Sequence, residues 1–290
     1  GGVRVAPSSA VRDAELLVCV DLDAGPRGRH ADALVRMASA VRREWLDPER
    51  VRTAEEIAFD AGRQAVAGTR RTTYGAIVLD EVALQAPRGP EVERVLADAA
   101  AADLAAALPL DDDAVVSLRT RVAFLREHRP DLGLPDLGED TLRELLPDLC
   151  RNRRSFAELR RAPLLDHLRG RLSWAQAQAL DREAPERLEV PSGSRIRLVY
   201  EPGRPPVLAV RIQALPGLRA TPTVANARVK VLLHLLAPNH RPQQVTDDLP
   251  SFWAGTYAVV RAELRRRYPK HAWPADPQSA APERRPRRRR

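Results

Sequence analysis

The sequence predicts an α+β protein: a small OB-like β-barrel domain, a helical segment, and a basic α/β C-terminal domain that ends in a disordered, arginine-rich tail. Three observations lead to this fold class. Short apolar runs separated by turn residues fill the first part of the 290-residue chain, apolar residues three or four apart fill the middle, and strand-like alternation returns in the last third. The predicted boundaries are 1–88, 89–184, 185–275 and 276–290.

Short strands joined by tight turns are predicted for residues 1–88. Glu15–Asp21 is a short apolar run, and Glu56–Asp60 and Gln64–Ala67 have the pattern of a hairpin. Thr72–Leu79 adds a further strand around a glycine. About five short strands within about 80 residues indicate a small barrel of the OB type.

Helical spacing dominates residues 89–184. Apolar residues recur every three or four positions from Val92 onward. Asp111–Asp113 is predicted to cap a helix that stops before Pro130. Ser173-Trp174 begins the last helix of this segment, which ends near Ala184.

The last third returns to strands before a final helix. Arg195–Tyr200 and Val207–Ile212 flank a Pro-Gly turn, and this pattern predicts a hairpin. Val229–Leu236 fits a buried strand or a helical turn, and its period does not decide between them. A helix is predicted from Pro250, with Trp253 on its apolar face. The tail from residue 276, rich in proline and arginine, is predicted to be disordered.

Positive charge is concentrated in the C-terminal third. Residues 1–189 hold 28 basic and 33 acidic side chains, a net charge of −5, whereas residues 190–275 carry a net +9 and residues 276–290 a net +4. Arginine outnumbers lysine 45 to 2, and its guanidinium fork suits phosphate. The asymmetry favours a polyanion partner, such as nucleic acid. The alternative is a basic face that docks on an acidic neighbouring domain.

Composition also narrows the cellular setting. No apolar run approaches the roughly 18 residues that a membrane span requires, and the first residues lack the pattern of a secretory signal. The two cysteines, Cys19 and Cys150, are far apart and form no CxxC motif. We therefore expect a cytoplasmic chain with two buried thiols and no membrane partner.

No catalytic or metal-binding residue is predicted. Ala76–Glu81 imitates a Walker B strand, but the sequence has no GxxxxGK[ST] loop to hold the phosphates. The six histidines form no pair at helical spacing, which leaves no pattern for a metal site. Ser192-Gly193-Ser194 lacks the surroundings of a nucleophile and is predicted to be a turn that orients Arg195.

The candidate nucleic-acid-binding residues combine arginine with one aromatic ring. They are Arg195, Arg197, Arg211, Arg265, Arg266, Arg267, Lys270 and Trp273. The first three could share one face of the hairpin. The run 265–267 ends a helix, where the dipole favours cations in any case. Arginine for phosphate and tryptophan for a base face is the combination that single-stranded nucleic acid requires.

Three stretches of the last third have unusual sequences in a fixed order. They are VPSGSR (190–195), HLLAPNHRPQQVTDDLPSFW (234–253) and RRRYPKHAWPADP (265–277). Together they resemble the C-terminal region of HrpB, a family of bacterial DEAH-box ATP-dependent helicases. VRVAPSSAVRDAELLVCVDLD (3–23) and TRRTTYGAIVLDE (69–81) resemble the β-rich segment that follows the motor in the same family.

The resemblance implies a helicase accessory region without the RecA-like motor domains. Its implied role is to bind and orient single-stranded RNA or DNA, with RNA favoured, and to dock on the helicase core, normally in the same polypeptide. ATP and Mg²⁺ would be held by that motor, so this chain alone is expected to be inactive as an ATPase. The alternative is a protein-interaction module that docks on the core or on an acidic partner without contacting nucleic acid.

Overall fold

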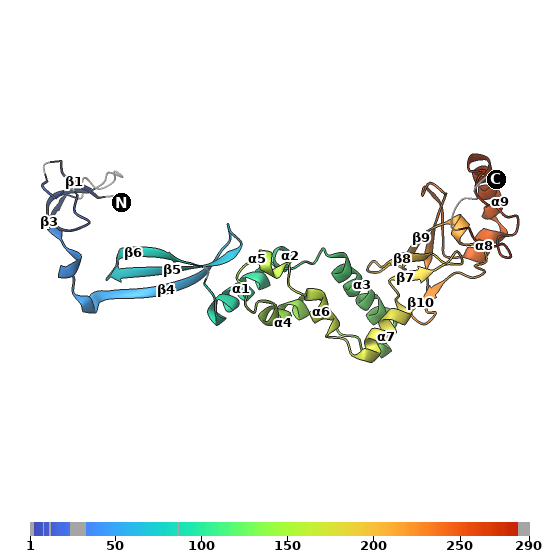
Figure 1. Ribbon diagram of the computed structural model, residues 1–290, viewed down its shortest axis with the longest axis horizontal. Coiled ribbons are helices and arrows are strands. Elements are labelled where there is room, and N and C mark those ends of the chain that lie inside the picture. Colours follow the sequence, from blue (N-terminus) through green and yellow to red (C-terminus); the bar gives the residue numbers. More distant parts are fainter. Residues whose placement is uncertain (1–2, 8, 12, 24–32, 86, 284–290) are drawn as a thin grey trace. The chain divides into compact units, whose positions relative to one another are not determined.

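The computed structural model describes residues 3–7, 9–11, 13–23, 33–85 and 87–283, and Figure 1 labels the elements. The chain divides into two compact units. Unit 1 comprises Gly1–Asp60 and Val66–Pro87, and unit 2 comprises Ala61–Ala65 and Arg88–Arg290. No helix in the described ranges is long and apolar enough to cross a membrane.

Unit 1 contains two three-stranded sheets. The first has the order β1-β3-β2 and the second the order β4-β5-β6. The strands are β1 (Val3–Val5), β2 (Leu16–Asp23), β3 (Ala33–Val41), β4 (Val51–Asp60), β5 (Ala65–Tyr74) and β6 (Ile77–Leu84). Two 3₁₀ turns, Arg43–Trp45 and Pro48–Arg50, join the sheets.

The predicted OB-like barrel is wrong for the described strands, which form these two open sheets and not a closed barrel. Val18, Val20 and Leu22 alternate along β2 and are 50–62% exposed. In a small barrel, alternate side chains would fill a shared interior. The short apolar runs identified β2 and the hairpin of β4 and β5, but Thr72–Leu79 is not one strand, because β5 ends at Tyr74 and β6 begins at Ile77. The runs carry no information on which strand edges meet.

The two thiols differ in their surroundings. Cys150 is buried, as predicted, and burial raises its pKa to about 12. Cys19 is exposed, so the prediction of a second buried thiol is wrong. Its strand, β2, has an uncovered face, which a sequence pattern alone does not reveal.

Unit 2 begins with short helices, as the apolar spacing predicts. They are α1 (Pro90–Ala102), α2 (Leu104–Ala107), α3 (Asp113–His128), α4 (Glu139–Leu149), α5 (Phe156–Leu159), α6 (Leu164–Arg169) and α7 (Trp174–Glu183), with a 3₁₀ turn at Pro130–Leu132. Asp112 caps α3, because its Oδ1 accepts hydrogen bonds from the backbone N–H groups of Ala114 and Val115.

A five-stranded sheet follows, in the order β13-β12-β9-β8-β7. Its strands are β7 (Arg187–Glu189), β8 (Arg195–Val199), β9 (Val207–Arg211), β12 (Leu232–Leu236) and β13 (Pro242–Thr246), and a small ribbon of β10 (Thr223–Val224) and β11 (Val229–Lys230) precedes β12. β8 and β9 pair antiparallel, which confirms the predicted hairpin. The undecided segment 229–236 is extended, since β12 pairs parallel with β9.

The predicted C-terminal helix is two helices. α8 (Leu249–Ala254) and α9 (Thr256–Arg267) are separated by Gly255. Trp253 is nonetheless buried, as predicted for the apolar face, and Tyr257 and Leu264 are buried with it.

The tail prediction is wrong for residues 276–283, which fold back onto the domain. The N–H of Gly217 donates to the carbonyl of Pro277, and the N–H of Glu283 donates to that of Gln213. A carboxylate oxygen of Glu283 accepts from the N–H of Ala272 at 2.9 Å. Gly217 has φ +92°, a conformation that favours glycine. The six tail arginines lie at 284–290, outside the described residues.

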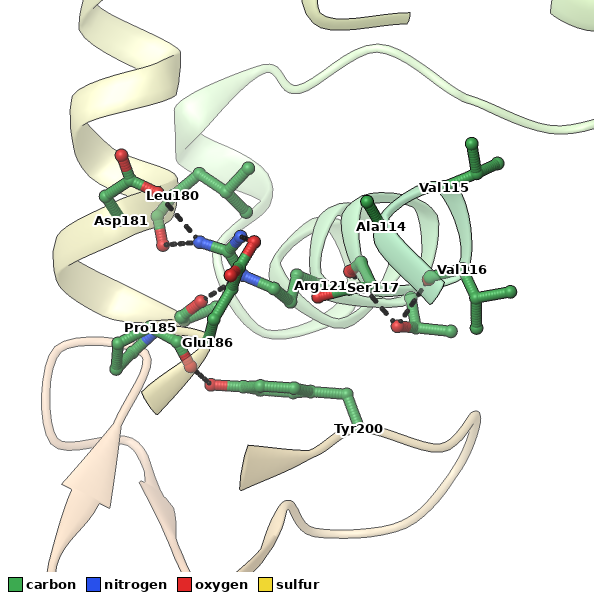
Figure 2. Close-up of polar contacts among 12 residues, drawn as sticks. Ala114, Val115, Val116, Ser117, Arg121, Leu180, Asp181, Pro185, Glu186 and Tyr200 are labelled. Carbon is green, nitrogen blue, oxygen red and sulfur yellow. Dashed lines mark hydrogen bonds and ion pairs between the residues drawn. The ribbon is translucent and has the colours of Figure 1, made fainter. Parts of the chain in front are cut away.

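One arginine connects the helices to the sheet. The side chain of Arg121, in the middle of α3, is only 4% exposed. Its Nε donates to the carbonyl of Ala184 at 2.5 Å, and its two Nη atoms lie 2.9 Å from Asp181 and 3.0 Å from Glu186. Figure 2 shows the guanidinium directed at the C-terminal end of α7 and at the residues that lead into β7.

A second set of polar contacts lies at the C-terminal end of α3. Arg129 pairs with Glu183 and with Asp131, whose pKa its guanidinium lowers to about 2. From the sheet side, Nη1 of Arg228 donates to the carbonyl of His128 at 2.8 Å. The helical segment and the sheet are thus held together at two places.

We predict that Arg121→Ala destabilises the chain by roughly 1–3 kcal/mol, because it removes the side-chain donor that the carbonyl of Ala184 accepts from. Arg126→Ala is the matched control on the same helix. Its side chain is 40% exposed and its pair with Asp136 is solvated, so a change within about 0.5 kcal/mol is expected. Urea unfolding monitored by circular dichroism measures both variants, and equal losses would contradict the assignment of Arg121.

Candidate nucleic-acid interface

The face of the C-terminal sheet that carries Arg195 and Arg197 is basic. Leu198 opposite Leu208 and Val199 opposite Val207 define the register of β8 and β9. Side chains alternate along a strand, so the odd-numbered residues of β8 and β9 lie on one face of the sheet and the even-numbered residues on the other. The even-numbered leucines are buried beneath the sheet. Arg195 and Arg197 point away from that core and are exposed.

Two further arginines belong to the same face. Arg187 of β7 is directly opposite Arg197. Arg211, at the end of β9, is half-buried and odd-numbered like Arg195 and Arg197. The three predicted hairpin arginines therefore share one face, as expected. Glu189 of β7 lies on the same face, opposite Arg195, and is its acidic member. We call the four arginines of this face, Arg187, Arg195, Arg197 and Arg211, the basic sheet face.

The second predicted cluster lies at the end of α9. Arg265, Arg266, Arg267 and Lys270 are all exposed. Within the described ranges, no carboxylate lies within 4.0 Å of any of these four cations, whereas Arg94, Arg143 and Arg151 of the helical segment each have a carboxylate partner. Arg267 lies over the ring of Tyr268 at 5.8 Å. This cluster, which we call the α9 cluster, is a concentration of uncompensated positive charge.

Trp273 does not provide a stacking surface. It is 8% exposed, and its indole N–H donates to the carbonyl of Tyr268 at 3.0 Å. Nε of Arg261 donates to the carbonyl of Trp273 itself. The prediction of a base-stacking ring at this position is therefore wrong in this structure, because the chain turns back after α9 and packs the ring inward.

A different tryptophan, Trp174, is exposed to solvent. The sequence predicts only that it lies at the start of a helix. Trp174 is 79% exposed at the first position of α7. Ser173 forms a capping box with Gln176, so the helix end that holds the ring is well defined. Arg169 and Arg171 precede it, and this basic-aromatic spacing is the signal that could have identified the position.

The remaining sequence motifs have structural roles. Asp80 lies within β6 and accepts a 2.6 Å hydrogen bond from Nη1 of Arg43, which lowers the pKa of the carboxyl. Ser192–Ser194 forms the turn between β7 and β8, with Gly193 at φ +74°. Among the described residues, no three His, Cys, Asp or Glu side chains gather as metal ligands.

Comparisons with known proteins agree with this architecture. The family model described as "ATP-dependent helicase C-terminal" (HrpB_C) matches residues 145–277. The chain is 33% identical over 243 residues to the ATP-dependent RNA helicase HrpB of Escherichia coli strain K12, covering 82% of this chain and 30% of that protein. The chain thus spans less than a third of the length of that curated relative.

Two solved structures are similar over nearly the whole chain. The crystal structure of the E. coli DExH-box NTPase HrpB gives a TM-score of 0.66 at 31% identity, with 95% of this chain and 34% of that chain covered. The crystal structure of the E. coli DEAH/RHA helicase HrpB gives 0.58 at 28% identity, with 93% and 34% covered.

These matches define the chain as the C-terminal region of a DEAH-type helicase, since the family model covers most of the C-terminal part of unit 2 and the solved structures match nearly the whole chain. More particularly, the chain belongs to the HrpB family.

Proposed function

We propose that this chain binds single-stranded nucleic acid, RNA in particular, and orients it for the RecA-like helicase core of the same polypeptide. The observation behind this proposal is the charge of the C-terminal domain. The α9 cluster has no carboxylate partners in the described part of the chain, and the basic sheet face adds four arginines in one plane. Cations concentrated on one domain form the electrostatic footprint of a nucleic-acid-binding protein.

Trp174 supplies the aromatic part of the site in this proposal. Stacking on an exposed ring contributes roughly 1–3 kcal/mol per base and tolerates any base. The arginines hold the backbone and the ring holds a base face, so binding is expected to be independent of sequence.

Docking on the motor is the second part of the proposal, and it is assigned to unit 1. Val18, Val20 and Leu22 of β2 and Val78 and Val82 of β6 are 50–62% exposed. Apolar sheet faces of this kind favour a protein partner, because burying them releases ordered water. ATP and Mg²⁺ are assigned to the motor and not to this chain.

We predict that replacing Arg265, Arg266 and Arg267 with Gln flattens the dependence of log affinity on log salt by about 2, since each phosphate contact to a single strand contributes about 0.7. Fluorescence anisotropy with oligo(U) measures this slope. The matched control replaces Arg94, Arg143 and Arg151 with Gln, which removes the same net charge from ion-paired positions. Equal slopes in the two triple variants would contradict the site. Failure of the wild-type chain to bind any homopolymer would favour the protein-interaction alternative.

Trp174→Ala should weaken binding to oligo(U) by roughly 1–3 kcal/mol and leave binding to heparin unchanged, because heparin offers no base to stack. Trp45→Ala is the control, since that ring is also exposed, at 65%, but lies in unit 1. A parallel loss for heparin and RNA, or an equal effect of the control, would contradict the stacking role.

The purified chain should release no phosphate from ATP, with or without RNA. The sequence lacks a phosphate loop, and the carboxylate of Asp80 is engaged by Arg43. A phosphate-release assay checks this expectation. Hydrolysis that Asp80→Asn abolishes would show that the Walker B-like strand is catalytic after all.

A further inference from the structure

A polar pocket of about 240 Å³ lies where the helical segment meets the edge of the C-terminal sheet. Three arginines from three different elements line it: Arg169 from the end of α6, Arg187 from β7 and Arg197 from β8. Ser117 of α3 adds a half-buried hydroxyl. We call this the arginine pocket.

The acidic groups of the pocket only partly balance its cations. Glu186 is already held by the buried guanidinium of Arg121 at 3.0 Å. Asp113 is 88% exposed on its side chain and reaches Arg197 only at 3.5 Å. A solvated pair at that distance contributes little.

The other two arginines, Arg169 and Arg187, have no carboxylate partner within 4.0 Å among the described residues. Arg187 has a 3.3 Å hydrogen bond from Nη1 to the carbonyl of Arg195, which leaves its charge uncompensated. Arg169 is exposed at the end of α6. Three guanidinium groups that converge in this way repel one another, and an anion between them removes that repulsion.

The chemistry of the lining selects the kind of anion. Guanidinium forks match the paired oxygens of a phosphate, and a hydroxyl adds one more donor. The end of α3 is not counted as a donor, because Asp112 already caps the N–H groups of Ala114 and Val115.

The position of the pocket selects the source of the phosphate. Arg187 and Arg197 are cross-strand neighbours and belong to the basic sheet face, which continues to Arg195 along β8. A strand that follows this face therefore reaches the pocket at its end.

We propose that the arginine pocket binds one backbone phosphate of a single-stranded nucleic acid and so fixes the strand at the junction between the helical segment and the sheet. This inference rests on the proposed function, and it adds a defined contact outside the α9 cluster. Arg169 and Arg187 form this contact together with Arg197, whereas the sequence alone singled out only Arg197.

The test compares Arg169→Gln/Arg187→Gln with wild type in the complete chain, by anisotropy with labelled oligo(U) over a salt series. Loss of the contact to one phosphate of a single strand should reduce the salt slope by about 0.7. The matched control is Arg160→Gln/Arg161→Gln, which removes two exposed arginines of the same segment that do not line the pocket. It should leave the slope near that of wild type.

A second variant separates charge from geometry. Arg169→Lys/Arg187→Lys keeps both charges but removes the forks, so its affinity should lie between wild type and the Gln variant. Inorganic phosphate, added as competitor, should displace less RNA from the Gln variant than from wild type when each is compared with an equal concentration of chloride.

The outcomes distinguish the two proposals. If wild type binds RNA and the Gln variant behaves like the Arg160/Arg161 control, the pocket proposal is overturned and the proposed function stands. If wild type does not bind single-stranded RNA, both fail. If inorganic phosphate stabilises the wild-type chain against heat in that case, the pocket is a site for free phosphate and the assignment to a strand is wrong.

Discussion

The buried guanidinium of Arg121 is the constraint on which the geometry of unit 2 depends. A side chain that is 4% exposed must have its donors satisfied, and here the acceptors come from the end of α7 and from Glu186. β7 begins three residues after Ala184, so fixing that carbonyl also fixes the edge of the sheet. The arginine pocket lies at this edge, and Glu186 both lines the pocket and binds Arg121.

The functional interpretation depends on where arginines lie relative to carboxylates, and not on how many there are. Arginine is abundant along the whole chain. In the helical segment, residues such as Arg94 and Arg143 have carboxylates one helical turn away, and solvated pairs of this kind neutralise each other. In the α9 cluster the helix ends in three consecutive arginines, with no carboxylate in ion-pair range among the described residues. The α9 cluster is therefore a local concentration of positive charge without carboxylate partners among the described residues.

The sequence predicted the features that depend on local pattern and missed those that depend on distant contacts. The hairpin of β8 and β9 follows from alternation on both sides of a Pro-Gly turn, and the structure has it. The burial of Trp273 depends on the chain turning back after α9, and the docking of residues 276–283 depends on Gly217, some 60 positions earlier. Arg121 was also missed, although it lies beside the buried stripe of Leu118, Val122 and Leu125, which is an unusual place for a charged side chain.

The two units present surfaces that require different kinds of partner. Unit 1 exposes apolar side chains of β2 and β6, and only a protein surface with apolar groups of its own would cover them favourably. Unit 2 exposes cations whose mutual repulsion an anionic strand would relieve. Under the proposed function, both demands would be met by different partners: the motor would cover the apolar side chains of unit 1, and a nucleic-acid strand would contact the cations of unit 2. A single acidic protein partner would satisfy the second demand but would leave the apolar sheets of unit 1 exposed to water.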